Sequence, residues 1–139
     1  MPLSQSDKKD FIDGWIVVVF AEHAEKMESQ ELEAMHSWSR EEIERFSEIG
    51  NQTIKTSWCV GRYLQRSILS VLMEVEPDNL TFEYGKYGKP FLHGSDVNFN
   101  LSHTTGCTML AVSAQGGIGC DIEIAYQPVP NFNLVSNSF

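Results

Sequence analysis

The sequence is poor in basic residues and has no long apolar run. It holds 10 Lys and Arg against 19 Asp and Glu, which gives a formal net charge of −9 and a pI near 4.8. That balance argues against nonspecific binding to nucleic acid or to an anionic membrane surface. No stretch reaches the roughly 18 apolar residues of a membrane span. The first residues mix lysine with aspartate and lack an apolar centre, so they do not resemble a secretory signal.

Cysteine is also scarce. Cys59, Cys107 and Cys120 are an odd number and have no metal-ligand spacing. A secreted domain held together by disulfides would carry more cysteines in so short a chain. We therefore expect a soluble protein of the reducing cytoplasm.

A chain of 139 residues suits one globular domain with a single core. We expect that domain over residues 1–125. Residues 126–139 lack charge and periodicity and include two prolines, so we predict a poorly organised tail there.

The N-terminal half predicts a strand and a capped helix. The β-branched and aromatic run before residue 22 predicts a strand at about 15–21. Ser39 and Glu42 have the spacing of a capping box, which predicts a helix that starts at Ser39 and ends near Gly50. Ile43 and Phe46 are expected to face inward.

A longer helix is predicted over about 53–75, where apolar residues recur with the helical period. Lys55, Arg62 and Arg66 fall within about 40° of one another on the opposite face. This cationic stripe has two interpretations, an ordinary solvated helix surface and an anion-binding surface.

The rest of the chain predicts short strands. Residues 80–84 read as a strand, and the glycines and proline of GKYGKP (85–90) indicate an exposed turn that carries Lys89. Turn signals then divide an uncharged region into strands at about 97–101, 107–113 and 118–124. We expect an antiparallel meander packed against the long helix, which is an α+β fold.

Two carboxylates could bind a divalent cation. Asp121 and Glu123 are two residues apart on the last predicted strand, so they share one face. Two neighbouring carboxylates repel each other, and a divalent cation between them would remove this repulsion. Mg²⁺ suits such a site, because it takes one or two protein carboxylates and completes its shell with water and phosphate oxygens. The alternative is a strand that simply leaves the core for water.

Ser102 and His103 end a predicted strand at an accessible turn. Adjacent strand residues point to opposite faces, so the pair is badly placed to act as nucleophile and base. The two residues have two interpretations. They contact the phosphate or the base of a ligand, or Ser102 caps the turn and His103 has its hydrogen-bond partners within the protein.

Three motifs in order carry a family resemblance. GKYGKP (85–90), FNLSH (99–103) and GIGCDIE (117–123) resemble the GKP, FN(L/I)SH and (I/V)G(I/V)DIE motifs of Sfp-type 4′-phosphopantetheinyl transferases. GRYLQRSIL (61–69) and SWSREEIERF (37–46) are similar to helices of the same family. The resemblance covers about residues 15–125.

The resemblance implies transfer of 4′-phosphopantetheine from coenzyme A to a serine of an acyl or peptidyl carrier protein. Asp121 and Glu123 would act in catalysis and hold Mg²⁺. Lys89, Ser102 and His103 would contact the adenosine and 3′-phosphate end of coenzyme A. Arg62 would make a further contact with that phosphate, and Arg66 is a weaker candidate for the same role.

Family members of this type are about twice as long and have two similar halves. Their C-terminal half carries a WxxKEA motif whose glutamate completes the metal site, and nothing after Glu123 matches it. The chain resembles the N-terminal half alone, so we expect a truncated product that is either active through self-association or a noncatalytic remnant that binds coenzyme A or carrier protein. An acidic α+β interaction domain with accidental motifs is the third interpretation.

Overall fold

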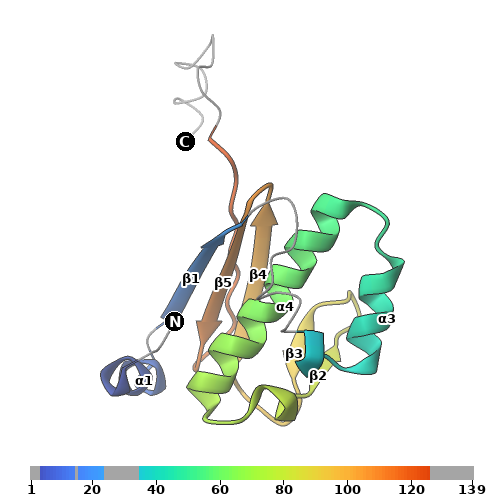
Figure 1. Ribbon diagram of the computed structural model, residues 1–139. Coiled ribbons are helices and arrows are strands. Elements are labelled where there is room, and N and C mark those ends of the chain that lie inside the picture. Colours follow the sequence, from blue (N-terminus) through green and yellow to red (C-terminus); the bar gives the residue numbers. More distant parts are fainter. Residues whose placement is uncertain (1–3, 15, 24–34, 126–139) are drawn as a thin grey trace.

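The computed structural model describes residues 4–14, 16–23 and 35–125. The helices are α1 (Gln5–Ile12), α3 (Arg40–Glu48) and α4 (Gln52–Met73), with 3₁₀ turns η1 (Met35–Ser37) and η2 (Pro77–Asn79). The strands are β1 (Ile16–Glu22), β2 (Phe82–Tyr84), β3 (Pro90–Leu92), β4 (Asn98–Thr104) and β5 (Cys107–Ser113). Helix α4 lies between the larger sheet and the layer formed by α3 with β2–β3 (Figure 1). This confirms the predicted α+β fold, an antiparallel sheet packed against a long helix.

The larger sheet is antiparallel and has the order β1-β5-β4. Its central strand is buried almost throughout, and Leu110 faces Val19 on one neighbour and Leu101 on the other. Helix α4 packs its apolar side onto this sheet. The shared core includes Val60, Leu64, Ile68, Leu72, Leu110 and Val112.

The predicted strand at 118–124 is wrong. The place beside β5 that a third meander strand would take belongs to β1, so β5 has no free edge for residues 118–124. This segment instead follows β4 through side-chain contacts. The amide of Cys120 donates to Asn100 Oδ1 at 3.1 Å, and the amide of Ile122 donates to Ser102 Oγ at 3.0 Å.

Helix α4 agrees closely with its prediction. Asn51 caps its first turn by accepting from the amide of Ile54 at 3.0 Å, and Glu74 ends it in the left-handed conformation. Val75, the last residue of the predicted range 53–75, lies beyond the end of the helix and is 40% exposed.

Helix α3 has the predicted capping box and a different inward face. Ser39 Oγ accepts from the amide of Glu42, and the Glu42 carboxylate accepts from the amide of Ser39. Glu42 is only 1% exposed, whereas Ile43 is 45% exposed. The prediction that Ile43 faces inward is wrong, because the Glu42 carboxylate has a partner inside the protein.

The GKYGKP turn joins two short paired strands. Tyr84 on β2 faces Pro90 on β3, and the amide of Gly85 donates to the carbonyl of Lys89 at 2.9 Å. Gly88 has a positive φ of 80°, a conformation that glycine adopts without steric cost. The sequence prediction gave β2 but not β3.

None of the described helices is both long and apolar enough to cross a membrane. The predicted tail at 126–139 lies outside the described residues.

Candidate functional site

A cavity of about 380 Å³ lies between α4, the GKYGKP loop and β4. Arg62 reaches it from the helix and Lys89 from the loop, and Asn100 lines it from the strand. Two cationic side chains that are 27 positions apart in the sequence therefore face one cavity. Tyr87, Gly88, Pro90, Phe99 and Leu101 complete the lining.

Arg62 is almost completely buried, at 7% exposure. Its Nε and Nη1 are wholly buried and contact no hydrogen-bond acceptor among the described residues. Its guanidinium carbon lies 5.0 Å from the centre of the Trp58 ring. Burial lowers the pKa of Arg62 from its ordinary value. A buried cation without an acceptor is costly, which makes the cavity favourable for an anion.

The interpretation of the cationic stripe as a solvated helix surface is wrong for its two arginines. Arg62 and Arg66 are 7% and 5% exposed, because α3 and β2–β3 cover the side of α4 that faces away from the larger sheet (Figure 1). Lys55 is half-buried, with its Nζ 4.6 Å from the centre of the Phe46 ring.

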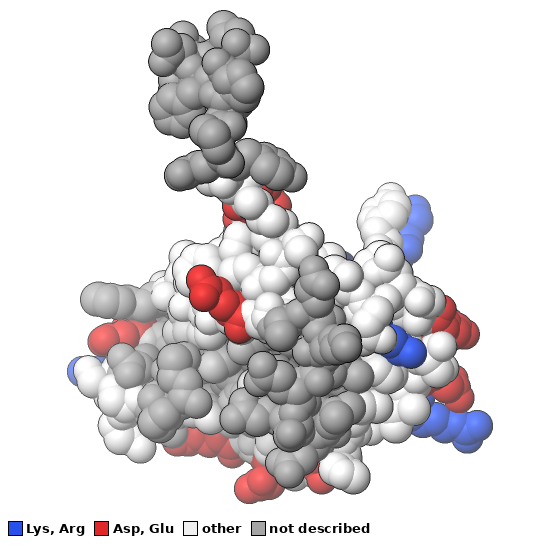
Figure 2. All heavy atoms as spheres, turned by 45° about the horizontal axis from the view of Figure 1, so that its top comes forward, with Lys and Arg blue, Asp and Glu red and all other residues white. Residues whose placement is uncertain are grey.

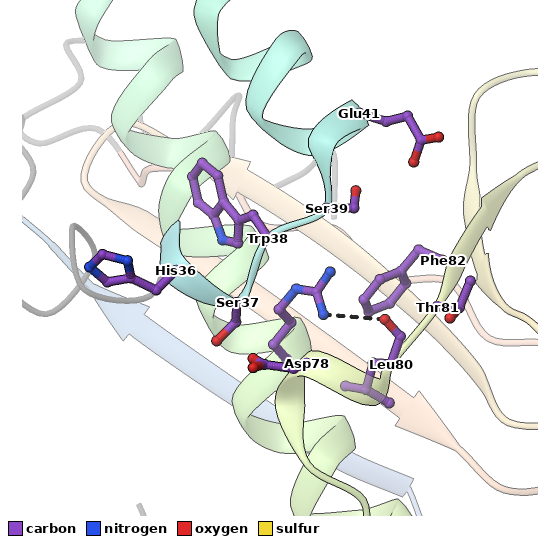
Figure 3. A pocket seen from close by; sticks show the side chains of 10 residues that line it. His36, Ser37, Trp38, Ser39, Glu41, Asp78, Leu80, Thr81 and Phe82 are labelled. Carbon is purple, nitrogen blue, oxygen red and sulfur yellow. Dashed lines mark hydrogen bonds between the residues drawn. The ribbon is translucent and has the colours of Figure 1, made fainter.

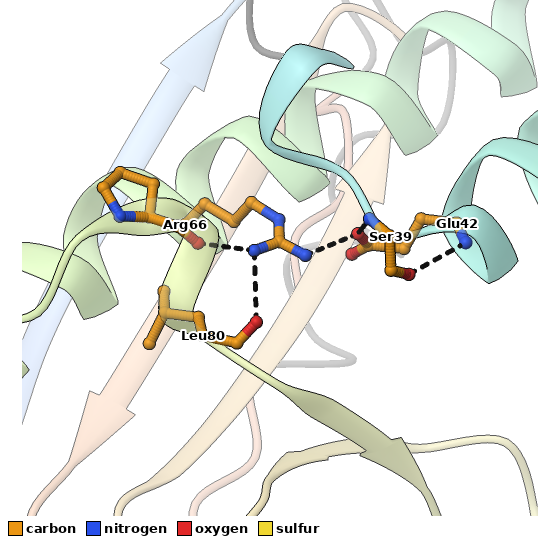
Figure 4. Close-up of polar contacts among 5 residues, drawn as sticks. Ser39, Glu42, Arg66 and Leu80 are labelled. Carbon is orange, nitrogen blue, oxygen red and sulfur yellow. Dashed lines mark hydrogen bonds and ion pairs between the residues drawn. The ribbon is translucent and has the colours of Figure 1, made fainter.

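Arg66 has its contacts inside the protein. Its Nη2 donates to Glu42 Oε2 at 2.6 Å, and its Nη1 donates to the carbonyls of Pro77 at 2.6 Å and Leu80 at 3.3 Å (Figure 4). These bonds tie α4 to α3 and to the segment before β2. Arg66 therefore has a structural role.

Arg66 also lines a second cavity, of about 310 Å³. Figure 3 shows Trp38, Asp78 and Phe82 among the other residues that line it. The lining has carboxylates as well as hydroxyls, and Arg66 is already paired with Glu42. The first cavity is therefore the better anion site.

Ser102 and His103 point in different directions, as expected for neighbours on a strand. The Ser102 hydroxyl donates to Asp121 Oδ1 at 3.3 Å and accepts from the amide of Ile122. His103 is exposed. The structure thus brings Ser102 and Asp121 together and leaves His103 open to solvent.

Asp121 and Glu123 are both exposed, with half-buried Ile122 between them. Their oxygen donors suit Mg²⁺, which needs one or two protein carboxylates and otherwise water or phosphate oxygens. Within residues 4–14, 16–23 and 35–125, no group of three or more His, Cys, Asp or Glu residues is placed to bind a metal. A cation held by these two carboxylates would need ligands from a substrate.

Asn100 connects the cavity to the carboxylate segment. Its side chain lines the cavity, and its Oδ1 accepts from the amide of Cys120, next to Asp121. The thiol of Cys120 also donates to Asn100, at 3.3 Å to the backbone carbonyl. The cationic cavity and the carboxylates are therefore neighbouring parts of one site.

Three residues of this region were not identified from the sequence. Asn100 belongs to the FNLSH motif, so its place in a motif was an available signal. Glu42 was identified only as a helix cap. Tyr84, whose hydroxyl is wholly buried with no partner in the described part of the chain, gave no signal.

On the face shown in Figure 2, Lys and Arg side chains are few and scattered among acidic and uncharged residues, and no broad basic area is visible there. Arg62, by contrast, is buried and lines the cavity.

Comparison with protein families identifies the chain. The model of the family described as "4′-phosphopantetheinyl transferase, N-terminal" matches residues 24–115. The chain belongs to the 4′-phosphopantetheinyl transferase family. The matched range includes Arg62, Lys89, Ser102 and His103, and it stops before Asp121.

Individual 4′-phosphopantetheinyl transferases are also similar to this chain. AcpT of Salmonella typhi is 38% identical over 85 residues, which are 60% of this chain and 40% of that protein. HetI of Nostoc sp. is 33% identical over 100 residues, which are 69% of this chain and 42% of that protein. Gsp of Aneurinibacillus migulanus is 34% identical over 64 residues, 46% of this chain and 26% of that protein. The chain spans about two fifths of the length of AcpT and HetI.

Proposed function

We propose that this chain binds coenzyme A and takes part in Mg²⁺-dependent transfer of its 4′-phosphopantetheine arm to a serine of an acyl or peptidyl carrier protein. The observation that carries the proposal is the cavity shared by Arg62 and Lys89, beside the Asp121 segment, in a member of this family. Hydrogen bonds from cationic side chains to phosphate oxygens are short and strong.

Arg62 and Lys89 would hold phosphate oxygens of coenzyme A in the cavity. Arg62 suits this role because it is fixed by burial and by the Trp58 ring, and so loses little side-chain freedom on binding. Lys89 is exposed on the loop and would close over the ligand. Ser102 and His103, at the end of β4, would contact the adenosine and 3′-phosphate end.

Asp121 and Glu123 would hold Mg²⁺ against the pyrophosphate, where a bound Mg²⁺ neutralises charge that builds up on phosphate oxygens. In the reaction the carrier serine gives its proton to a base. Its oxygen then bonds to the phosphorus that bears pantetheine, and 3′,5′-adenosine bisphosphate leaves as the old P–O bond breaks. The protein contributes mainly position and electrostatic stabilisation.

The second candidate function is binding of coenzyme A or carrier protein without turnover. It is favoured by the small number of metal ligands, since no group of three or more His, Cys, Asp or Glu among the described residues is placed to bind a metal. For the transfer reaction, self-association would supply further metal ligands from a second copy of the chain.

The three cysteines all lie among the described residues and none is in a disulfide, which supports a cytoplasmic location.

The test is incubation of the chain with coenzyme A, Mg²⁺ and several apo carrier proteins, followed by intact-protein mass spectrometry. Transfer predicts a carrier mass increased by one phosphopantetheine, and loss of that gain in Asp121→Ala. Asp96→Ala is the matched control, because Asp96 is exposed on the connection before β4. Calorimetric titration of coenzyme A and of apo carrier protein into the chain separates the two functions: binding of either one without any mass gain would favour the noncatalytic function, and binding of neither would contradict both.

A further inference from the structure

Residues 118–122 follow β4 without a backbone ladder. Strand β4 lies at the edge of the sheet, in the order β1-β5-β4, and in the described part of the chain its backbone pairs with β5 alone. Two side chains of β4 hold the segment instead. Asn100 Oδ1 accepts from the amide of Cys120 at 3.1 Å, and Ser102 Oγ accepts from the amide of Ile122 at 3.0 Å.

The two hydrogen bonds have the spacing of an extended pair of chains. Asn100 and Ser102 are two positions apart on β4, so they share one face. The two amides that they hold are also two positions apart. Residues 120–122 therefore run beside β4 in the same direction and are held at alternate residues, as in a strand ladder. Asp121 is the residue between the two points of attachment.

Each point of attachment has a second hydrogen bond. The Cys120 thiol donates to the backbone carbonyl of Asn100 at 3.3 Å, and the Ser102 hydroxyl donates to Asp121 Oδ1 at 3.3 Å. Asn100 thus holds the main chain on one side of Asp121, while Ser102 holds the other side and the carboxylate. Of these two β4 residues, Asn100 is the one that also lines the cavity of about 380 Å³.

The contact with the carboxylate segment is particular to Asn100. Because the Cys120 amide is a donor, it requires the oxygen of the Asn100 side chain and not its nitrogen. Asn98 lies two positions earlier on the same face of β4, and its Nδ2 donates to the carbonyl of Asp96 at 3.0 Å. An asparagine on this face therefore does not hold the segment merely by being there.

We propose that Asn100 is a positioning residue for Asp121. It acts through the Cys120 amide and keeps the Asp121 carboxylate beside the cavity in which phosphate groups would lie. A divalent cation that joins this carboxylate to a phosphate gains less from a carboxylate that it must first immobilise, since ordering a mobile segment costs entropy. The part of this inference that concerns Mg²⁺ and coenzyme A rests on the proposed function, whereas the holding of the segment does not.

The first test needs neither ligand nor metal. Hydrogen exchange of the Cys120 amide is measured by NMR in the wild-type chain and in three variants. Asn100→Ala removes the acceptor, so exchange should become about fivefold faster while β5 stays protected. Asn100→Asp keeps an oxygen acceptor and should keep the slow exchange, as should Asn98→Ala, the matched control. Unchanged exchange in Asn100→Ala, or equally fast exchange in all three variants, would overturn the proposal.

The second test measures how much Mg²⁺ strengthens coenzyme A binding, as the ratio of the dissociation constants without and with Mg²⁺ from calorimetry. Asn100→Ala should lower this ratio severalfold, toward one, and should have no further effect on it in the Asp121→Ala background. A direct contact of Asn100 with coenzyme A would change both constants alike and leave the ratio unchanged, which would overturn the proposal.

Failure of the proposed function is a separate outcome. If the wild type does not bind coenzyme A, or binds it without any response to Mg²⁺, the proposed function fails. The exchange of the Cys120 amide in the free chain still decides whether Asn100 positions Asp121.

Discussion

Arg66 and Glu42 form a buried ion pair, with 2.6 Å between Nη2 and Oε2 and side chains that are 6% and 2% exposed. The same carboxylate closes the capping box of α3 (Figure 4). One side chain thus fixes both the start of α3 and its position against α4.

The first prediction concerns the stability of that pair. Glu42→Gln leaves Arg66 charged and buried without its carboxylate, so the free energy of unfolding should fall by about 3–5 kcal/mol. The measurement is urea unfolding followed by circular dichroism. Glu44→Gln is the control, because its partner Arg40 is 91% exposed, and it should cost less than about 1 kcal/mol. Equal losses in the two variants would contradict the structural role given to Glu42.

The second prediction concerns the segment that carries Asp121. Ser102→Ala removes the acceptor of the Ile122 amide and the donor to Asp121. Hydrogen exchange at residues 120–123 should therefore become faster, while β5 stays protected. Ser47→Ala, which removes an exposed hydroxyl from α3, should change neither region. Unchanged exchange at residues 120–123 would show that Ser102 does not hold the segment.

The third prediction concerns the Cys120 thiol. Burial raises its pKa above the ordinary value of 9.0, and the nearby Asp121 carboxylate raises it further. A raised pKa means that the folded state holds its proton more tightly than the unfolded state. This contribution to stability is present below the unfolded pKa and is lost as the pH rises through the folded pKa.

Alkylation by iodoacetamide tests this directly, because the thiolate is the reactive form. Modification of Cys120, followed by peptide mass spectrometry, should be slower in the folded chain than in urea at pH values near and below about 9. The difference should shrink at higher pH. Equal rates in the folded and unfolded chain at every pH would contradict the raised pKa.

Local signals predicted the elements well. The capping box of Ser39 and Glu42 involves residues three apart, and the apolar face of α4 repeats within one helix, so both are visible in a short window. The turn at GKYGKP was predicted for the same reason. Strand β3 was missed because three residues that begin with Pro90 give too short a pattern.

Long-range partners explain the errors. Glu42 faces inward because Arg66, 24 residues later, pairs with it, and nothing local distinguishes it from Ile43. Residues 118–124 do not pair with β5 because β1 occupies that edge of β5. Composition cannot show which strand arrives there.

The candidate site was predicted in part. The family resemblance named Arg62 and Lys89, and the structure places both at one cavity. The burial of Arg62 could not be predicted, since it depends on elements that are distant from it in the sequence. The burial of the Tyr84 hydroxyl also depends on packing, so it became visible only in the structure.

We propose that the cavity between Arg62 and Lys89 binds phosphate groups of coenzyme A. The most direct measurement is calorimetric titration of coenzyme A, with Mg²⁺, into the wild-type chain and into Lys89→Met and Lys86→Met. Lys86 is an exposed lysine of the same loop that does not line the cavity. We expect binding that Lys89→Met weakens about tenfold or more and Lys86→Met leaves nearly unchanged. No binding by the wild type, or equal weakening by the two substitutions, would contradict the account.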